Sequence, residues 1–197
     1  MNSLKRVSLL SVLWANGRIT PVFSIHLATK VCLRVYKALG VRFSGTPNYI
    51  STRTTLDGTD YSLIQIGEGV TISSYIRLLT HDWALYTVAK ALGYMPDKPV
   101  GRVAGITIGD YSFVGTGSVI MPGTTIGRGC LIGAGTVVRG HIPDYSIVVG
   151  SPCEIIGDTR DFVRRNVERG VLPHSEDKVV STNRDKHANY PGAKVGK

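Results

Sequence analysis

The chain lacks long apolar runs and has few cysteines, and each shortage excludes a class of protein. No segment approaches the roughly 18 consecutive apolar residues of a membrane-spanning helix, so the sequence predicts no such helix. The three cysteines, Cys32, Cys130 and Cys153, form neither a CxxC motif nor an even disulfide framework, which fits a reducing cytoplasm. The apolar stretch after Lys5 and Arg6 is too short for a convincing signal peptide, and we expect a cytoplasmic protein.

Charged and aromatic residues are also scarce, at 19% and 8% of the 197 residues. The balance is nevertheless basic, with 23 Lys and Arg against 14 Asp and Glu, a formal net charge of +9. Such a balance suits nucleic acid, an anionic membrane or an anionic small molecule. The basic residues do not lie among aromatic residues or form a nucleic-acid-binding motif, so we expect no nucleic-acid partner. Glycine is abundant, as turn-dense repeats require.

What the chain does contain is a six-residue repeat between Ile108 and Pro143. Its units are IGDYSF, VGTGSV, IMPGTT, IGRGCL, IGAGTV and VRGHIP, each beginning with Ile or Val. The fifth position is small or β-branched in the first five units: Ser112, Ser118, Thr124, Cys130 and Thr136. A period of six is neither the 3.6 of a helix nor the 2.0 of a simple strand. It is typical of a parallel β-helix, where each unit is one short strand and a turn, and the aliphatic residues stack inside.

A second run of the repeat lies upstream, separated by a gap. Units IGEGVT, ISSYIR and LLTHDW cover residues 66–83, enough for one triangular coil. Ile66 and Ile108 are 42 residues apart, a multiple of six, so the register continues across the gap. Residues 84–107 lack the repeat and are expected to form a loop extruded from the solenoid. The loop follows His81 and its two neighbours directly, which favours a functional role.

The segments on either side of the solenoid domain, residues 42–157, are expected to cap it. Residues 1–41 are predicted to be helical, with Pro21 opening a helix that ends at Gly40. The last segment, residues 158–197, is predicted to form a short helix over 159–170 followed by a flexible polar tail.

A basic stripe on the expected N-terminal helix leaves two interpretations open. Lys30, Arg34 and Lys37 fall on one helix face. The stripe is either the solvated side of a helical cap or a surface for peripheral membrane association, at the inner face of the membrane.

Three features together resemble the hexapeptide-repeat acyltransferases. They are the hexads, a histidine that ends a coil just before an extruded loop, and the closing phrase IPDYSIVVGSPCEIIG. The resemblance covers residues 43–157 and implies an all-β solenoid, a left-handed parallel β-helix; the repeat alone does not show its hand. The most similar members are small bacterial acetyltransferases that modify sugars or polysaccharide units. They imply acetyl-CoA as co-substrate, a carbohydrate acceptor, and a homotrimer with each active site between two subunits.

The resemblance implies that His81 is the catalytic base. Acyl transfer to a hydroxyl needs a base near neutral pH to take the proton as the oxygen attacks the thioester, and a neutral imidazole suits this step. Asp82 is a second catalytic candidate, either orienting the imidazole or serving as a turn carboxylate. Trp83 is either an acceptor-binding platform or a packing residue.

The resemblance also implies where coenzyme A would bind. The pantetheine arm would contact the turns, and Arg139 would face the 3′-phosphate because a guanidinium suits phosphate. At that place the family often has Thr-Lys-Asp, whereas this chain has Arg-Gly-His. The expected cofactor-binding residues are Gly115, Thr116, Ala134, Arg139 and Gly140.

The sequence leaves three other functions to consider. An N-acetyltransferase acting on an amino sugar or sugar nucleotide is the main alternative. A zinc carbonic anhydrase on the same solenoid needs three histidine ligands, but the other histidines lie outside the coils or at the wrong place, so we expect no metal requirement. A non-catalytic scaffold is disfavoured because His81 and the adjoining loop are present.

Overall fold

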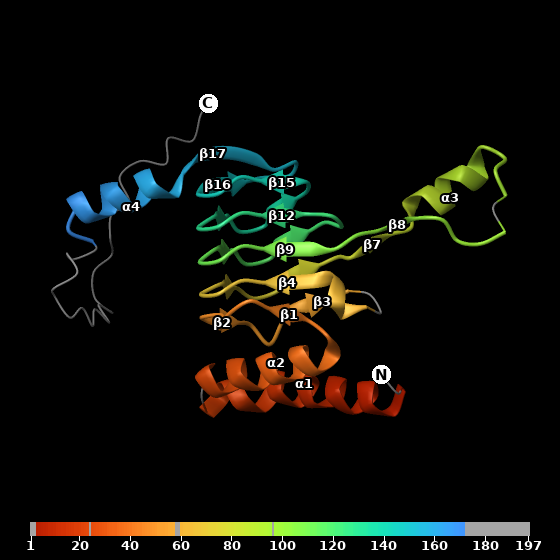
Figure 1. Ribbon diagram of the computed structural model, residues 1–197, viewed down its shortest axis with the longest axis horizontal. Coiled ribbons are helices and arrows are strands. Elements are labelled where there is room, and N and C mark those ends of the chain that lie inside the picture. Colours follow the sequence, from red (N-terminus) through yellow and green to blue (C-terminus); the bar gives the residue numbers. More distant parts are fainter. Residues whose placement is uncertain (1–2, 24, 58–59, 96, 172–197) are drawn as a thin grey trace. The chain divides into compact units, whose positions relative to one another are not determined.

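The computed structural model describes residues 3–23, 25–57, 60–95 and 97–171 (Figure 1). Contacts divide the chain into one unit of residues 1–162 and a second of residues 163–197. Among the described residues, no helix combines the length and apolar character needed to cross a bilayer.

Three sheets form the sides of a triangular solenoid in the first unit, and nearly all neighbouring strands in them are parallel. Sheet A contains β1 (Arg42–Phe43), β4 (Ile64–Ile66), β9 (Ile106–Ile108), β12 (Thr125–Ile126) and β15 (His141–Ile142). Sheet B contains β2 (Tyr49–Ile50), β5 (Thr71–Ile72), β10 (Phe113–Val114), β13 (Leu131–Ile132), β16 (Ser146–Val149) and β17 (Glu154–Asp158). Sheet C contains β3 (Thr55–Leu56), β6 (Arg77–Leu78), β11 (Val119–Ile120) and β14 (Val137–Val138). The parallel β-helix read from the hexads is therefore present.

The register of the coils follows the hexad count. Ile66 pairs directly with Ile108, and Ile108 with Ile126, so the gap between the two repeat runs leaves the stacking intact. Ile126 then pairs with Ile142, which lies sixteen residues on instead of eighteen. The last turn between sheets C and A is shorter by two residues, and this explains why the unit VRGHIP departs from the pattern.

The interior consists of stacked aliphatic side chains with a column of hydroxyl groups at the turns. Ile72, Val114 and Ile132 of sheet B are in register and have no exposed surface. Ser118 is equally buried, and its hydroxyl lies 2.8 Å from the Gly115 carbonyl oxygen and 2.9 Å from that of Gly133. The small fifth position of the repeat thus satisfies turn carbonyls that would otherwise be buried without a partner.

Two helices cover the N-terminal end of the solenoid. They are α1 (Ser3–Phe23) and α2 (Ile25–Leu39), which pack against each other, and α2 also packs on β2 and the 3-10 turn η1 (Tyr61–Leu63). Gly40 ends α2 as expected, with φ of 113° and an N–H that donates to the Tyr36 carbonyl. The prediction that Pro21 opens a helix is wrong, because Pro21 lies in the last turn of α1.

At the other end, β17 runs antiparallel to β16 and closes sheet B. The C-terminal helix α4 (Thr159–Glu168) follows, and Gly170 has the positive φ of 68° typical of a helix end. The predicted polar tail lies almost wholly outside the described residues.

The segment between β6 and β9 leaves the solenoid, as Figure 1 shows. Its two arms, β7 (His81–Asp82) and β8 (Arg102–Val103), pair antiparallel. The expected loop is more ordered than the sequence indicated, since it carries the helix α3 (Ala84–Ala91).

Candidate active site

His81 lies at the corner where the chain passes from sheet C to sheet A, at the root of the extruded segment. Its Nδ1 is 3.2 Å from Oδ2 of Asp57, and the two side chains are 29% and 32% exposed. Asp57 directly follows β3, one coil nearer the N-terminal helices. The pair is therefore fixed by the stacking of two coils and remains partly exposed to solvent.

The contact with Asp57 determines which nitrogen of His81 can act as a base. An ionised carboxylate only accepts hydrogen bonds, so this contact favours the tautomer that carries the proton on Nδ1. In neutral imidazole the second nitrogen, Nε2, then keeps its lone pair. The arrangement can accept a proton at Nε2 and stabilise the resulting imidazolium through the carboxylate.

Asp82 does not orient His81 in this structure. Its Oδ1 accepts a hydrogen bond of 2.9 Å from the Ala84 backbone N–H and so holds the start of α3. Asp57 occupies the orienting position, and sequence reasoning missed it. A signal existed: Leu56 pairs with Leu78, so the residue after Leu56 had to lie near the residues after Leu78.

Trp83 packs beside His81, and its role in acceptor binding stays a prediction. Its ring centroid is 5.7 Å from that of His81, at an interplanar angle of 43°. A Cβ on Gly101 would come within 2.4 Å of the indole ring, so Trp83 packs against the returning arm of the segment. The side chain is still 43% exposed, which leaves an aromatic surface beside His81.

The five expected cofactor-binding residues divide between two corners of the solenoid. Gly115, Thr116 and Ala134 lie between sheets B and C, whereas Arg139 and Gly140 lie between sheets C and A, the corner of His81. The strands of sheet C separate the two groups. One chain thus brings His81 and Arg139 to the same corner, but not Thr116 or Ala134.

The corner between sheets B and C presents open backbone donors. Within the described part of the chain, the N–H groups of Thr116 and Ala134 donate to no protein acceptor. At the corner between sheets A and B, the corresponding N–H groups of Glu68 and Arg128 donate to Asp110 and Asp144. Thr116 and Ala134 are both exposed, so their amides are free to bind a ligand's carbonyl groups.

Gly115 contributes in a different way. A Cβ there would lie 2.6 Å from the Ala134 nitrogen, so glycine is needed for the coils to stack. No group of three or more His, Cys, Asp and Glu side chains suited to a metal ion occurs among the described residues.

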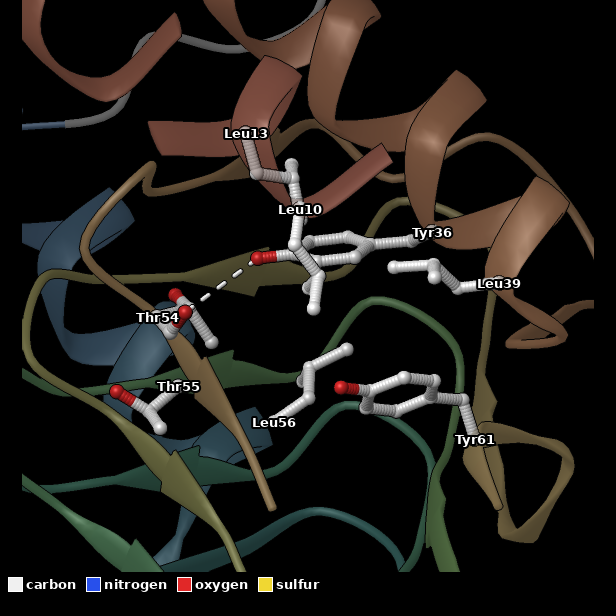
Figure 2. Close-up of a pocket in the computed structure, with 8 residues that line it drawn as sticks. All are labelled: Leu10, Leu13, Tyr36, Leu39, Thr54, Thr55, Leu56 and Tyr61. Atoms are coloured by element: carbon white, nitrogen blue, oxygen red, sulfur yellow. Dashed lines mark hydrogen bonds between the residues drawn. The ribbon is translucent and has the colours of Figure 1, made fainter. Parts of the chain in front are cut away.

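A pocket of about 200 Å³ lies elsewhere, between the two N-terminal helices and the first coil (Figure 2). Leu10 and Leu13 of α1 face Tyr36 of α2 across it. The Thr54 hydroxyl on its wall is buried with no hydrogen-bond partner in the described structure. None of its walls belongs to the His81 corner, so it is not the candidate active site.

Comparison with known proteins decides the family. The sequence model described as bacterial transferase hexapeptide (six repeats) matches residues 105–140. Protein CapG of Staphylococcus aureus is 31% identical over 158 residues, which cover 78% of this chain and 89% of CapG. This chain belongs to the hexapeptide-repeat acyltransferase family. The resemblance seen in the sequence is confirmed, and the protein is an acyltransferase.

Other relatives match over shorter spans. A probable acetyltransferase of Mycobacterium tuberculosis is 31% identical over 67% of this chain, which spans only 41% of that relative. Galactoside O-acetyltransferase of Escherichia coli is 33% identical over 52% of this chain and 47% of its own length.

Solved structures confirm the fold. A hexapeptide-repeat acetyltransferase from Vibrio cholerae, complexed with acetyl coenzyme A, has a TM-score of 0.58 at 19% identity, covering 78% of this chain and 86% of that one. A galactoside acetyltransferase in complex with coenzyme A has a TM-score of 0.57 at 20% identity, covering 81% and 83%. These neighbours and the parallel sheets fit a left-handed parallel β-helix.

Proposed function

We propose that this acyltransferase moves an acetyl group from acetyl-CoA to a hydroxyl group of a carbohydrate, with His81 as general base. The observation that carries the proposal is the pairing of His81 with Asp57 at an exposed corner. In this pairing the imidazole presents Nε2 as a base, which acyl transfer to a hydroxyl requires.

The proposed reaction moves the hydroxyl proton from the acceptor to the leaving thiol through His81. Nε2 of His81 takes the hydroxyl proton while the acceptor oxygen forms a bond to the thioester carbonyl carbon. The tetrahedral intermediate collapses as the carbon–sulfur bond breaks, and the leaving thiolate receives the proton from His81. Asp57 stabilises the imidazolium between these two events.

The open backbone amides at the corner between sheets B and C support the proposal that acetyl-CoA binds there. The pantetheine arm contains two amide groups, and Thr116 and Ala134 offer open N–H groups on neighbouring coils. Successive coils are about 4.8 Å apart, so the two donors form a short ladder. Arg139, which is exposed at the other corner, has a guanidinium suited to a phosphate of the same ligand.

The carbohydrate acceptor is proposed from the relatives and from Trp83. A putative lipopolysaccharide biosynthesis O-acetyl transferase and a galactoside O-acetyltransferase, both from Escherichia coli, are 29% and 33% identical to this chain over 96 and 102 residues. Their names point to carbohydrate acceptors, and we propose that the acceptor here is a glycan unit such as a capsule, exopolysaccharide or O-antigen sugar. The exposed indole beside His81 gives a sugar ring an apolar surface to stack on.

A homotrimer would bring the two corners together across a subunit boundary. The outer face of sheet B supports self-association, because Phe113, Leu131 and Ile147 form one apolar column in register. The matching positions of sheet A are polar: Thr107, Thr125 and His141. We propose that the donor corner of one subunit faces the His81 corner of its neighbour, and that the enzyme acts in the cytoplasm.

Thiol release from acetyl-CoA tests the reaction and distinguishes it from N-acetylation. The native protein is assayed with hydroxyl-bearing sugars and oligosaccharides, and in parallel with the corresponding amino sugars. Release that depends on a hydroxyl acceptor supports O-acetyl transfer. Release only with amino sugars would replace it with the N-acetyltransferase alternative.

A further inference from the structure

The N-terminal segment contains a strong charge asymmetry that the proposed reaction does not use. Residues 1–56 contain no Asp or Glu. They contain eight of the 23 basic residues of the chain: Lys5, Arg6, Arg18, Lys30, Arg34, Lys37, Arg42 and Arg53. Most of the net charge of +9 therefore belongs to this segment, whose main elements are α1 and α2.

The basic side chains of α2 point away from the solenoid. Cys32 and Tyr36 are 0% and 4% exposed and pack toward the first coil. Lys30, Arg34 and Lys37 are all exposed, and the spacing of four and three residues puts them on the opposite helix face. The outer face of α2 is thus a row of cations.

The outer face of α1 is apolar. Leu13 points into the pocket above the first coil, whereas Leu10 lines that pocket and is still 39% exposed (Figure 2). Leu10 also lines an outer hollow with Val7 and Trp14. On this outer side Leu4, Val7 and Trp14 are 78%, 59% and 64% exposed. Because α1 and α2 pack against each other, the same helical cap carries an exposed apolar row with a tryptophan and an exposed cationic row.

We propose that this outer face of α1 and α2, called here the cap face, docks on an anionic lipid bilayer. Lys and Arg gain energy near anionic headgroups, and apolar side chains with Trp enter the interfacial region. Since no described helix can cross a bilayer, the contact is peripheral. The absence of acidic residues from the whole segment leaves no repulsion to oppose it.

Docking would set the height of the active site above the lipid. His81 belongs to the second coil, so a helix layer about 10 Å thick and two coils of about 4.8 Å place it about 20 Å from the bilayer surface. Resting on the proposed function, this distance suits an acceptor sugar that is carried on a membrane lipid.

Vesicle flotation tests the docking at low salt, with phosphatidylcholine vesicles with and without phosphatidylglycerol. The test variant is Lys30→Glu/Arg34→Glu/Lys37→Glu. The control variant Lys98→Glu/Arg165→Glu/Arg169→Glu changes the net charge equally outside the cap face, at residues that are also exposed. We expect the native protein and the control to bind only anionic vesicles, and the test variant to lose about 10²-fold in partitioning. No binding by the native protein, or equal loss in both variants, would overturn the proposal.

Tryptophan fluorescence gives a second measurement that does not depend on charge reversal. The chain has two tryptophans, so Trp83→Phe leaves Trp14 as the only one. A blue shift of its emission on anionic vesicles is expected, and an unchanged spectrum in the presence of bound protein would contradict insertion of α1. Acetyl transfer to a water-soluble sugar by the triple variant of α2 separates the two proposals, because docking can fail while the reaction persists.

Discussion

The proposed role of His81 depends on its contact with Asp57. The carboxylate favours the proton on Nδ1 through a 3.2 Å contact, so Nε2 is the nitrogen proposed to act as base. Asp82, although adjacent in sequence, is engaged with the backbone of α3. We therefore expect opposite effects on activity when each carboxylate is replaced by the amide of the same shape.

Asp57→Asn should lower kcat by roughly 10²-fold, because an amide no longer enforces the tautomer or stabilises the imidazolium. The KM for acetyl-CoA should stay near its native value. Asp82→Asn is the matched control and should retain most of the activity. A larger loss from Asp82→Asn than from Asp57→Asn would return the orienting role to Asp82.

Cys130 allows a second test at the same scale. It is 1% exposed, its Sγ lies 3.1 Å from the Pro143 carbonyl oxygen, and burial raises the pKa of its thiol. Less thiolate and less access both slow its reaction. We expect the half-buried Cys153 to react first with a disulfide reagent near pH 8, as mass spectrometry of the labelled peptides would show. Equal labelling rates would contradict the burial of the repeat position.

At the scale of elements, the hexads predicted the strands and their register because every coil buries an aliphatic side chain at the same position of the repeat. Ile66 and Ile108 pair as their 42-residue separation implied. The helix in the extruded segment and the Asp57 contact were not predicted, because they depend on how one particular corner packs. The prediction for Pro21 was wrong because proline is favoured in the first turn of a helix, whereas Pro21 lies in the last turn of α1.

Tyr36 of α2 leads us to expect a loss of stability at alkaline pH. Burial raises the pKa of Tyr36 far above the usual 10, and its hydroxyl donates to the Thr54 carbonyl. A raised folded pKa means that the stabilisation is complete below about pH 10, where both states keep the proton. Above it the unfolded state ionises first, so the free energy of unfolding falls by about 1.4 kcal/mol per pH unit.

Urea unfolding at about pH 9 and about pH 11 measures this effect. The native protein should lose more stability between the two conditions than Tyr36→Phe, which has no proton to lose. The comparison of each protein with itself removes the constant cost of the missing hydroxyl. An equal loss in both proteins would show that Tyr36 ionises without resistance in the folded state.

At the scale of the whole molecule, the three outer faces of the solenoid differ, and the sequence predicted only part of this difference. The repeat predicts which residues point inward. The repeat does not assign a role to the residues that point outward. The apolar column of sheet B was therefore recognised only from the pairing register of its strands. The same register separates the corner of His81 from that of Thr116 and Ala134.

The trimer can be tested by placing a charge in that column. Phe113→Asp, at a position that is 41% exposed, should reduce the solution mass from three chains to one in light scattering. It should also remove acetyl transfer while the fold persists. Thr125→Asp on sheet A is the matched control and should remain trimeric. A native protein with the mass of a single chain would contradict the shared active site.

The most direct test of the central claim compares His81→Ala with the native protein in single-turnover acetyl transfer from acetyl-CoA to a hydroxyl acceptor. The claim predicts a loss of about 10²–10⁴-fold in the rate of transfer, with the affinity for acetyl-CoA nearly unchanged. A variant that transfers acetyl groups at the native rate would show that His81 is not the base.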